Sequence, residues 1–264
     1  MIDTPQQNYR FESTKQIKPH QIELFEGLKK KEPQPVSSLD GGFLMIATPR
    51  CGSTYLGELL NSTGRIGTIE EWFNYEYFMA WMMVNGIEEF NLKDYLTWIA
   101  QRTAVNGVFS LKWHVGQIAE MFKQFNVGIE SIKWKRVIYL NRRKKIEQAV
   151  SLAKAIRTNQ FRSYETPEQD DHIDLHDISF ALERICQQEK YFYQLLESHT
   201  DLTYHYEELV ADPVGQCNTI LRALGQEPAS SYETRVQKQA DEGSIGYARA
   251  FMLNLLGELH NEVS

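Results

Sequence analysis

Cysteine is scarce in this sequence, and its placement excludes two common classes of small protein. The 264 residues contain three cysteines, Cys51, Cys186 and Cys217, which lie far apart in the chain. An odd number at such spacings fits neither a disulfide framework nor a CxxC metal site. Because free cysteines persist in reducing compartments, we predict a cytoplasmic protein.

Long apolar runs and an excess of basic residues are also lacking. The longest apolar run covers residues 79–84, which is too short to cross a bilayer. Residues 1–10 are polar and lack the apolar core of a secretory signal. The formal net charge is -7, whereas a nucleic-acid binder needs a basic face. We therefore predict no membrane span and no nucleic-acid partner.

The composition and the pattern of apolar residues favour one large α/β domain. Hydrophobic residues make up 42% of the chain and aromatic residues 12%, enough for a substantial core. Residues 1–40 are polar and interrupted by proline, so we expect an arm or linker with one short amphipathic helix over residues 22–28. The domain itself is expected over residues 41–264.

Within this domain, short apolar runs alternate with helical patterns. Strands are predicted at residues 43–47, 107–112, 136–140 and 202–206, because each run is short and bounded by turn signals. Helices are predicted at residues 55–62, 91–102, 144–157, 176–198 and 213–224. This alternation predicts a P-loop-like three-layer fold, with a central parallel sheet flanked by helices. The aromatic-rich stretch over residues 72–98 is interpreted mainly as helix core.

The loop after the first predicted strand has the residues of an anion site but lacks the lysine of a nucleotide-hydrolysing loop. Ala47 stands where that loop has its first glycine, and Ser53 stands where it has lysine. The loop therefore disfavours a kinase or ATPase that uses magnesium. Gly52 lets the backbone approach a ligand, the following N–H groups begin a helix, and Arg50 adds charge. The alternative is a turn that only caps the helix.

Four blocks in order resemble the PAPS-dependent sulfotransferases, and in particular the bacterial trehalose and lipopolysaccharide-type branch. (PAPS is 3'-phosphoadenosine 5'-phosphosulfate.) The first block runs from the loop into a Glu-Glu-Trp-Phe sequence, and the second joins a strand end to a helix that carries a serine. The blocks are Thr48-Pro49-Arg50-Cys51-Gly52-Ser53-Thr54 with Glu70-Glu71-Trp72-Phe73, Val137-Ile138-Tyr139-Leu140-Asn141-Arg142-Arg143 with Ser151, Tyr204-His205-Tyr206-Glu207-Glu208-Leu209, and Gln237-Lys238-Gln239-Ala240-Asp241.

This resemblance implies a cofactor, PAPS, which leaves as the product PAP, and it implies no metal. It implies a clamp for the 5'-phosphosulfate made by Arg50, Cys51, Gly52, Ser53 and Thr54. The 3'-phosphate would be held by Arg142, Arg143 and Ser151, with Lys238 and Gln239 in the C-terminal cofactor segment. Arginine suits this task because its guanidinium pairs bidentately with phosphate oxygens. Cys51 is expected to fill space in the loop, although a helix N-terminus could lower its pKa.

The resemblance also implies the catalytic residues, with alternatives left open. Glu71 matches the general base that takes the acceptor's proton, and Lys112 matches a lysine near the transferring group. Arg50 is the third catalytic residue, as the clamp on the leaving phosphate. Glu70 and His114 are the competing bases.

Thr68 replaces a sugar-binding Glu of the trehalose-specific relatives. The predicted acceptor is therefore another sugar, a glycolipid or a hydroxylated natural product, and an amine acceptor stays open. A homodimer is implied by the resemblance alone. A small-molecule kinase and an inactive binding module are the alternative functions.

Overall fold

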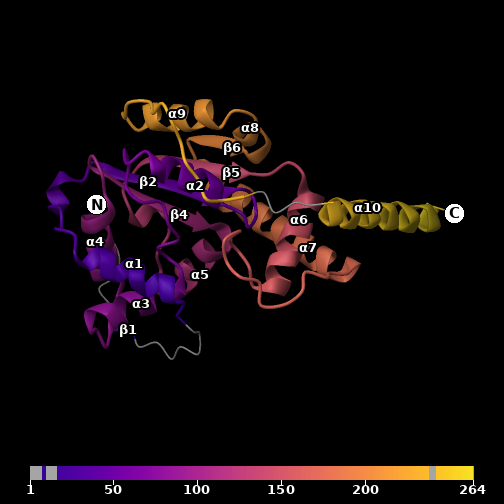
Figure 1. The fold of residues 1–264 in the computed structure, drawn as a ribbon, viewed down its shortest axis with the longest axis horizontal. Helices are drawn as coiled ribbons and strands as arrows, with labels where there is room; N and C mark the ends of the chain where they lie inside the picture. Colours follow the sequence, from indigo (N-terminus) through magenta and orange to yellow (C-terminus); the bar gives the residue numbers. More distant parts are fainter. Residues whose placement is uncertain (1–7, 10–16, 238–241, 264) are drawn as a thin grey trace.

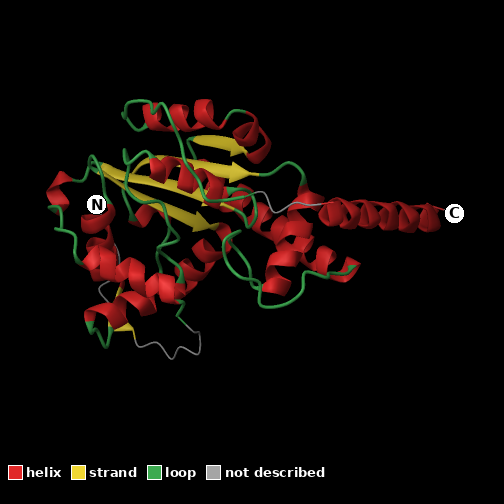
Figure 2. Ribbon diagram, viewed as in Figure 1, coloured by secondary structure: helices red, strands yellow, loops and turns green. Residues whose placement is uncertain are grey.

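A parallel sheet of four strands lies at the centre of the chain (Figure 2). The computed structural model describes residues 8–9, 17–237 and 242–263. The strands follow one another across the sheet in the order β4-β2-β5-β6. They are β2 (Gly41–Ala47), β4 (Val108–His114), β5 (Trp134–Asn141) and β6 (Leu202–His205). A short antiparallel pair, β1 (Asn8–Tyr9) and β3 (Phe90–Asn91), lies apart from this sheet.

Strand β2 shows why the sheet is covered on both faces. All seven of its residues are buried, as expected for a central parallel strand with a continuous apolar sequence. Side chains alternate between the two faces of a strand. Leu44 and Ile46 accordingly join one apolar cluster, whereas Phe43 and Met45 join another.

Helices from different parts of the chain cover the two faces (Figure 1). One face packs against α1 (Pro19–Lys29), α3 (Tyr75–Asn85), α4 (Leu92–Thr103) and α5 (Val115–Phe125). The other packs against α2 (Ser53–Ser62), α8 (Tyr206–Ala211) and α9 (Pro213–Ala223). A third cluster joins α6 (Lys145–Thr158), α7 (Leu175–Tyr191) and α10 (Glu242–Val263). The predicted three-layer α/β fold with a central parallel sheet is confirmed.

The strand register places four chain segments at one edge of the sheet. Ala47 lies opposite His114 on one side and Leu140 on the other, and Asn141 lies opposite His205. The carboxyl ends of all four strands therefore meet, and the segments that follow them come together. Ligands of open parallel sheets bind in a crevice at this edge.

Within the described residues, the predicted strands and helices are present with shifted ends, and three α-helices were not predicted. Helix α2 begins at Ser53, two residues before the predicted start. The long helix predicted to end at residue 198 stops as α7 at Tyr191 and continues as a π-helical turn over Phe192–Leu196. Helices α5, α8 and α10 were missed. Helix α10 extends away from the sheet in Figure 1, and its Ala248 and Phe251 pack in the cluster with α6 and α7.

Helix α1 packs into the large cluster on one face of the sheet. Its Phe25 is fully buried, and its ring lies among four aromatic rings of later segments. Their centroids are 5.9–6.4 Å away, in Trp72, Tyr77, Tyr95 and Trp98. The predicted helix over residues 22–28 thus begins earlier, at Pro19, and shares the core with residues of the sheet.

The aromatic-rich stretch is mostly core, as predicted. Trp72, Tyr77, Phe78, Trp81 and Tyr95 are all buried in the same cluster as Phe25. Among the described helices, none combines the length and apolar character that crossing a membrane requires.

Candidate active site

The loop between β2 and α2 opens onto a large cleft at the carboxyl edge of the sheet. Arg50, Gly52, Ser53 and Thr54 all line this cleft, whose volume is about 1870 Å³. Gly52 has φ 90°, in the left-handed region that glycine adopts most easily. A Cβ atom there would lie 2.4 Å from Cδ2 of Tyr206, so any side chain would collide with that ring. The loop thus needs glycine for its backbone angle and for its packing.

Cys51, within this loop, has a buried side chain and is not among the described residues that line the cleft. Burial raises the pKa of its thiol to about 11, against smaller opposing effects of nearby N–H groups and Lys112. The thiol is therefore neutral at physiological pH. The interpretation of Cys51 as a space-filling residue fits this environment, and the alternative of a lowered pKa is wrong.

Two arginines and a serine from distant segments meet beside the loop. Arg50 Nε donates to Ser151 Oγ at 2.9 Å, which joins the loop to helix α6. Arg142 Nη1 lies 3.5 Å from the backbone oxygen of Arg50, and its Nη2 pairs with Glu147 at 3.1 Å. Burial, and then the charge of Arg142, lower the pKa of Arg50 to about 10. Two cations held this close favour an anion between them.

Arg143 lies outside this group. Its side chain is 53% exposed and pairs with Glu208 at 2.5 Å, and it is not among the described residues that line the cleft. Its backbone N–H, with that of Lys144, donates to the carboxylate of Glu207. The Tyr-Glu-Glu segment of the third block therefore fixes the turn that presents Arg142.

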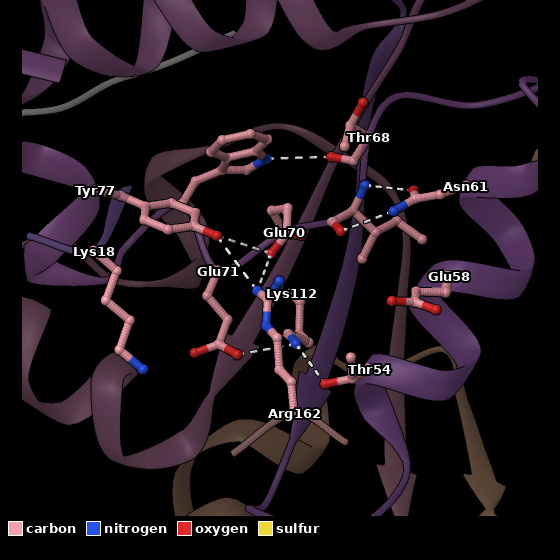
Figure 3. A network of polar contacts seen from close by, with 12 residues as sticks. Lys18, Thr54, Glu58, Asn61, Thr68, Glu70, Glu71, Tyr77, Lys112 and Arg162 are labelled. Carbon is pink, nitrogen blue, oxygen red and sulfur yellow. Dashed lines mark hydrogen bonds and ion pairs between the residues drawn. The ribbon is translucent and has the colours of Figure 1, made fainter. Parts of the chain in front are cut away.

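A chain of polar contacts connects the start of α2 with Glu71 (Figure 3). Lys112, on β4, is only 3% exposed, and its Nζ lies 2.9 Å from Glu71 Oε1 and 3.2 Å from Thr54 Oγ1. His114 Nε2, at the end of the same strand, is 3.5 Å from Glu71 Oε1. Thr54 and Glu71, both from the first block, and Lys112, which lies outside the four blocks, thus form one cluster.

The Glu71 carboxylate is ionised in this cluster. Burial alone would raise its pKa, but the charges of Lys112 and His114 and their hydrogen bonds hold the pKa well below its usual value. Its second oxygen accepts from Nε2 of Gln117 at 3.1 Å. Gln117 lies in the first turn of α5, a helix that the sequence analysis missed. A glutamine three residues after His114, the last residue of β4, was the sequence signal for the start of this helix, because a capping box has Gln or Glu at that position.

Glu70 has different partners from its neighbour. Its carboxylate accepts from Arg162 at 2.9 Å and from the hydroxyl of Tyr77 at 3.2 Å. Burial would lower the pKa of Arg162, but the charges of Glu70 and Tyr77 raise it overall. Figure 3 shows the Arg162 side chain running past Lys112 to reach Glu70 and Tyr77. Both glutamates are therefore ion-paired, but Glu71 lines the large cleft, and Glu70 is not among the described residues that line it.

Arg162 belongs to a segment, residues 159–165, that we call the strap. The strap lines the cleft from the connection between α6 and α7. Within the strap, the Glu165 carboxylate accepts from the backbone N–H groups of Phe161 and Arg162. Arg50 Nη1 donates to the backbone oxygen of Phe161. The sequence offered no sign of the contacts with Arg50 and Glu70, because they join residues 111 and 92 positions apart in the chain. The predicted cofactor residues Lys238 and Gln239 lie outside the described residues.

The match to a known family covers most of the chain. The model of the Stf0 sulphotransferase family matches residues 42–253. The chain belongs to the Stf0 sulphotransferase family. Its general class is therefore that of a sulfotransferase, a transferase enzyme, and the sulfotransferase resemblance is confirmed.

One solved structure gives a weaker likeness to this Stf0 family member. It is a sulfotransferase from Alicyclobacillus acidocaldarius, with 13% sequence identity and a TM-score of 0.43. The comparison covers 83% of this chain and 95% of that one. A search among curated proteins finds no match.

Proposed function

We propose that this protein transfers a sulfuryl group from PAPS to a hydroxyl or amine group of a small molecule, with Glu71 as the general base. The observation that supports this most directly is the Thr54–Lys112–Glu71 cluster. In this cluster Lys112 Nζ lies 3.2 Å from Thr54 Oγ1, at the start of α2, and 2.9 Å from the ionised carboxylate of Glu71.

The residues beside the loop fit a cofactor with two phosphate positions. The Nε atom of Arg142 is buried with no hydrogen-bond partner among the described residues. Buried donors are normally paired, so this one indicates a place for an anion. Ser151 adds a hydroxyl on α6, and the N–H groups of Ser53 and Thr54 begin α2. Arg50, Arg142 and Ser151 would hold PAPS, which when bound supplies the activated sulfuryl group.

Within the cluster, each side chain has a separate task. Glu71, ionised at neutral pH, would accept the proton of the acceptor group. Lys112 would stabilise the negative charge that develops between the loop and the acceptor, because its Nζ lies between Thr54 and Glu71. His114, 3.5 Å from Glu71, would support the carboxylate. We choose Glu71 as the base over Glu70 because Glu71 lines the large cleft, whereas Glu70 is not among the described residues that line it.

The cleft beyond Glu71 is lined by polar side chains, which supports a polar acceptor. Several of them carry carboxylate or amide groups that bond hydroxyls: Asn74, Glu76, Gln117, Glu120 and Gln188. A sugar, a glycolipid headgroup or a hydroxylated natural product has the matching groups. The alternative of a small-molecule kinase would need the loop lysine that binds the β- and γ-phosphates of ATP, and Ser53 stands in its place.

Calorimetric titration with PAP in the absence of metal, beside ATP with Mg²⁺, tests the proposal. We expect PAP to bind and Mg-ATP to bind far more weakly. Arg142→Ala should weaken PAP binding about 10- to 150-fold, because a hydrogen bond to a charged group contributes about 1.5–3 kcal/mol.

Arg143→Ala is the matched control, since that neighbouring side chain is exposed and paired with Glu208. Its affinity for PAP should stay within about threefold of wild type. Absence of PAP binding, or a preference for Mg-ATP, would reject the sulfotransferase proposal and favour a kinase. Equal losses in the two variants would show that Arg142 has no special place in the site.

A further inference from the structure

Gln117 makes two hydrogen bonds that fix the direction of its amide group. Its Oε1 accepts from the backbone N–H of His114 at 3.1 Å, and its Nε2 donates to Glu71 Oε2 at 3.1 Å. The oxygen and nitrogen of an amide are difficult to distinguish by shape alone. Here only one assignment works, because the backbone N–H needs an acceptor and the carboxylate needs a donor. The cap of α5 therefore aims the Gln117 amide N–H at Glu71.

The two oxygens of Glu71 have different partners. Oε1 is held by Lys112 at 2.9 Å, with His114 Nε2 at 3.5 Å, and both of these residues are on β4. Oε2 is held by Gln117 on α5. Tyr77, on α3, is near enough for the charge of Glu71 to affect its hydroxyl. Gln117 thus supplies an uncharged contact to this carboxylate, from an element other than β4.

We propose that Gln117 is a positioning residue, which holds the Glu71 carboxylate in one orientation beside the Thr54–Lys112 contact. The inference rests on the proposed function, because it gives Glu71 the role of base. A carboxylate held by Lys112 alone could rotate about its terminal bond. With Gln117 fixed by its helix cap, each oxygen of the Glu71 carboxylate, which lines the cleft, has its own donor.

Gln117 could instead serve only as the cap of α5, and one substitution separates these roles. Glutamate is as good a capping-box residue as glutamine at this position, so Gln117→Glu keeps the bond to the His114 N–H. It replaces the donor facing Glu71 with a second carboxylate. Gln117→Leu removes the donor without adding charge. Gln124→Glu is the matched control, because Gln124 lies on the same helix but is exposed at its far end.

The measurement is the pH titration of the Glu71 carboxyl carbon by ¹³C NMR in protein labelled at glutamate. The Glu71 signal is assigned by its loss in Glu71→Gln. We expect the Glu71 pKa to rise by about one pH unit in Gln117→Leu, because a hydrogen bond to the ionised form is lost. It should rise by about two pH units in Gln117→Glu, where a like charge is added. Gln124→Glu should leave it unchanged.

If the Glu71 pKa were the same in wild type and in both Gln117 variants, Gln117 would serve only to cap α5, and the proposal would be overturned. A shift in Gln124→Glu as large as that in Gln117→Glu would overturn it too, since the effect would then be long-range. PAP calorimetry on the same samples separates a failure of the proposed function from a failure of the proposed role of Gln117. If wild type does not bind PAP, the proposed function fails whatever the titrations give. If PAP binds equally to all variants and Glu71 does not shift, the role of Gln117 fails alone.

Discussion

Replacing Phe25 with alanine tests whether helix α1 belongs to the same cooperative unit as the sulfotransferase fold. The Phe25 ring is 0% exposed and contacts rings from three later segments. Burying a phenylalanine side chain contributes about 1.5–3 kcal/mol. The cavity left among rigid aromatic rings raises the expected loss in Phe25→Ala to about 3–5 kcal/mol.

Urea denaturation followed by tryptophan fluorescence is a suitable assay, because Trp72 and Trp98 lie against the Phe25 ring. The free energy of unfolding should fall in one cooperative transition, and the melting temperature should fall by about 6–20 °C. Phe122→Ala makes the same truncation at a phenylalanine that is 53% exposed. That control should change the free energy of unfolding by no more than about 0.5 kcal/mol.

Two outcomes would refute this reasoning. If Phe25→Ala were as stable as Phe122→Ala, the first forty residues would behave as a detachable arm. If Phe25→Ala instead unfolded in two steps, with the second at the wild-type urea midpoint, α1 would form a unit of its own. In either case the packing of α1 would contribute little to the stability of the sheet.

Two further predictions concern thiol reactivity and acid stability. A thiol reagent at pH 8 should modify Cys186 rapidly, and Cys51 and Cys217 only after unfolding, because burial raises their pKa values to about 11 and about 12; rapid labelling of all three would contradict this. At neutral pH, Glu71→Gln should lower the free energy of unfolding by about 1–3 kcal/mol, since buried Lys112 loses its partner. Because the folded pKa of Glu71 is depressed, its contribution is present above an unfolded value of about 4.5 and is lost as the pH falls through the folded pKa. The urea midpoints of the two proteins should therefore approach each other as the pH falls below about 4.5. A gap that stays constant with pH would be the contrary result.

Local sequence patterns predicted the strand, the loop and the helix that begin the site. The apolar run of β2, the small residues after it and the helical spacing of α2 are all adjacent in the chain. Their physics is local, because Gly52 supplies the backbone angle wherever the rest of the chain lies. The order of the four blocks was also sufficient to predict the family.

Neighbouring residues with the same chemistry could not be separated in this way. Glu70 and Glu71 are both glutamates, and Arg142 and Arg143 are both arginines. Which member of each pair faces the cleft depends on the direction of a single side chain, and that direction is set by partners distant in sequence. Arg162 engages Glu70, and Glu208 draws Arg143 away from the cleft.

The sequence by itself therefore determined the strand–loop–helix unit and the residue pattern of its loop, because these depend on residues close together in the chain. The alternation of strands and helices along the chain indicated a parallel sheet. Only the tertiary structure decided that Lys112 bridges Thr54 and Glu71, that Gln117 holds the second Glu71 oxygen, and that α1 lies in the core. The reason is the parallel register of the strands. It aligns the carboxyl ends of β2, β4 and β5, and so brings together side chains whose spacing along the chain gives no measure of their distance in space.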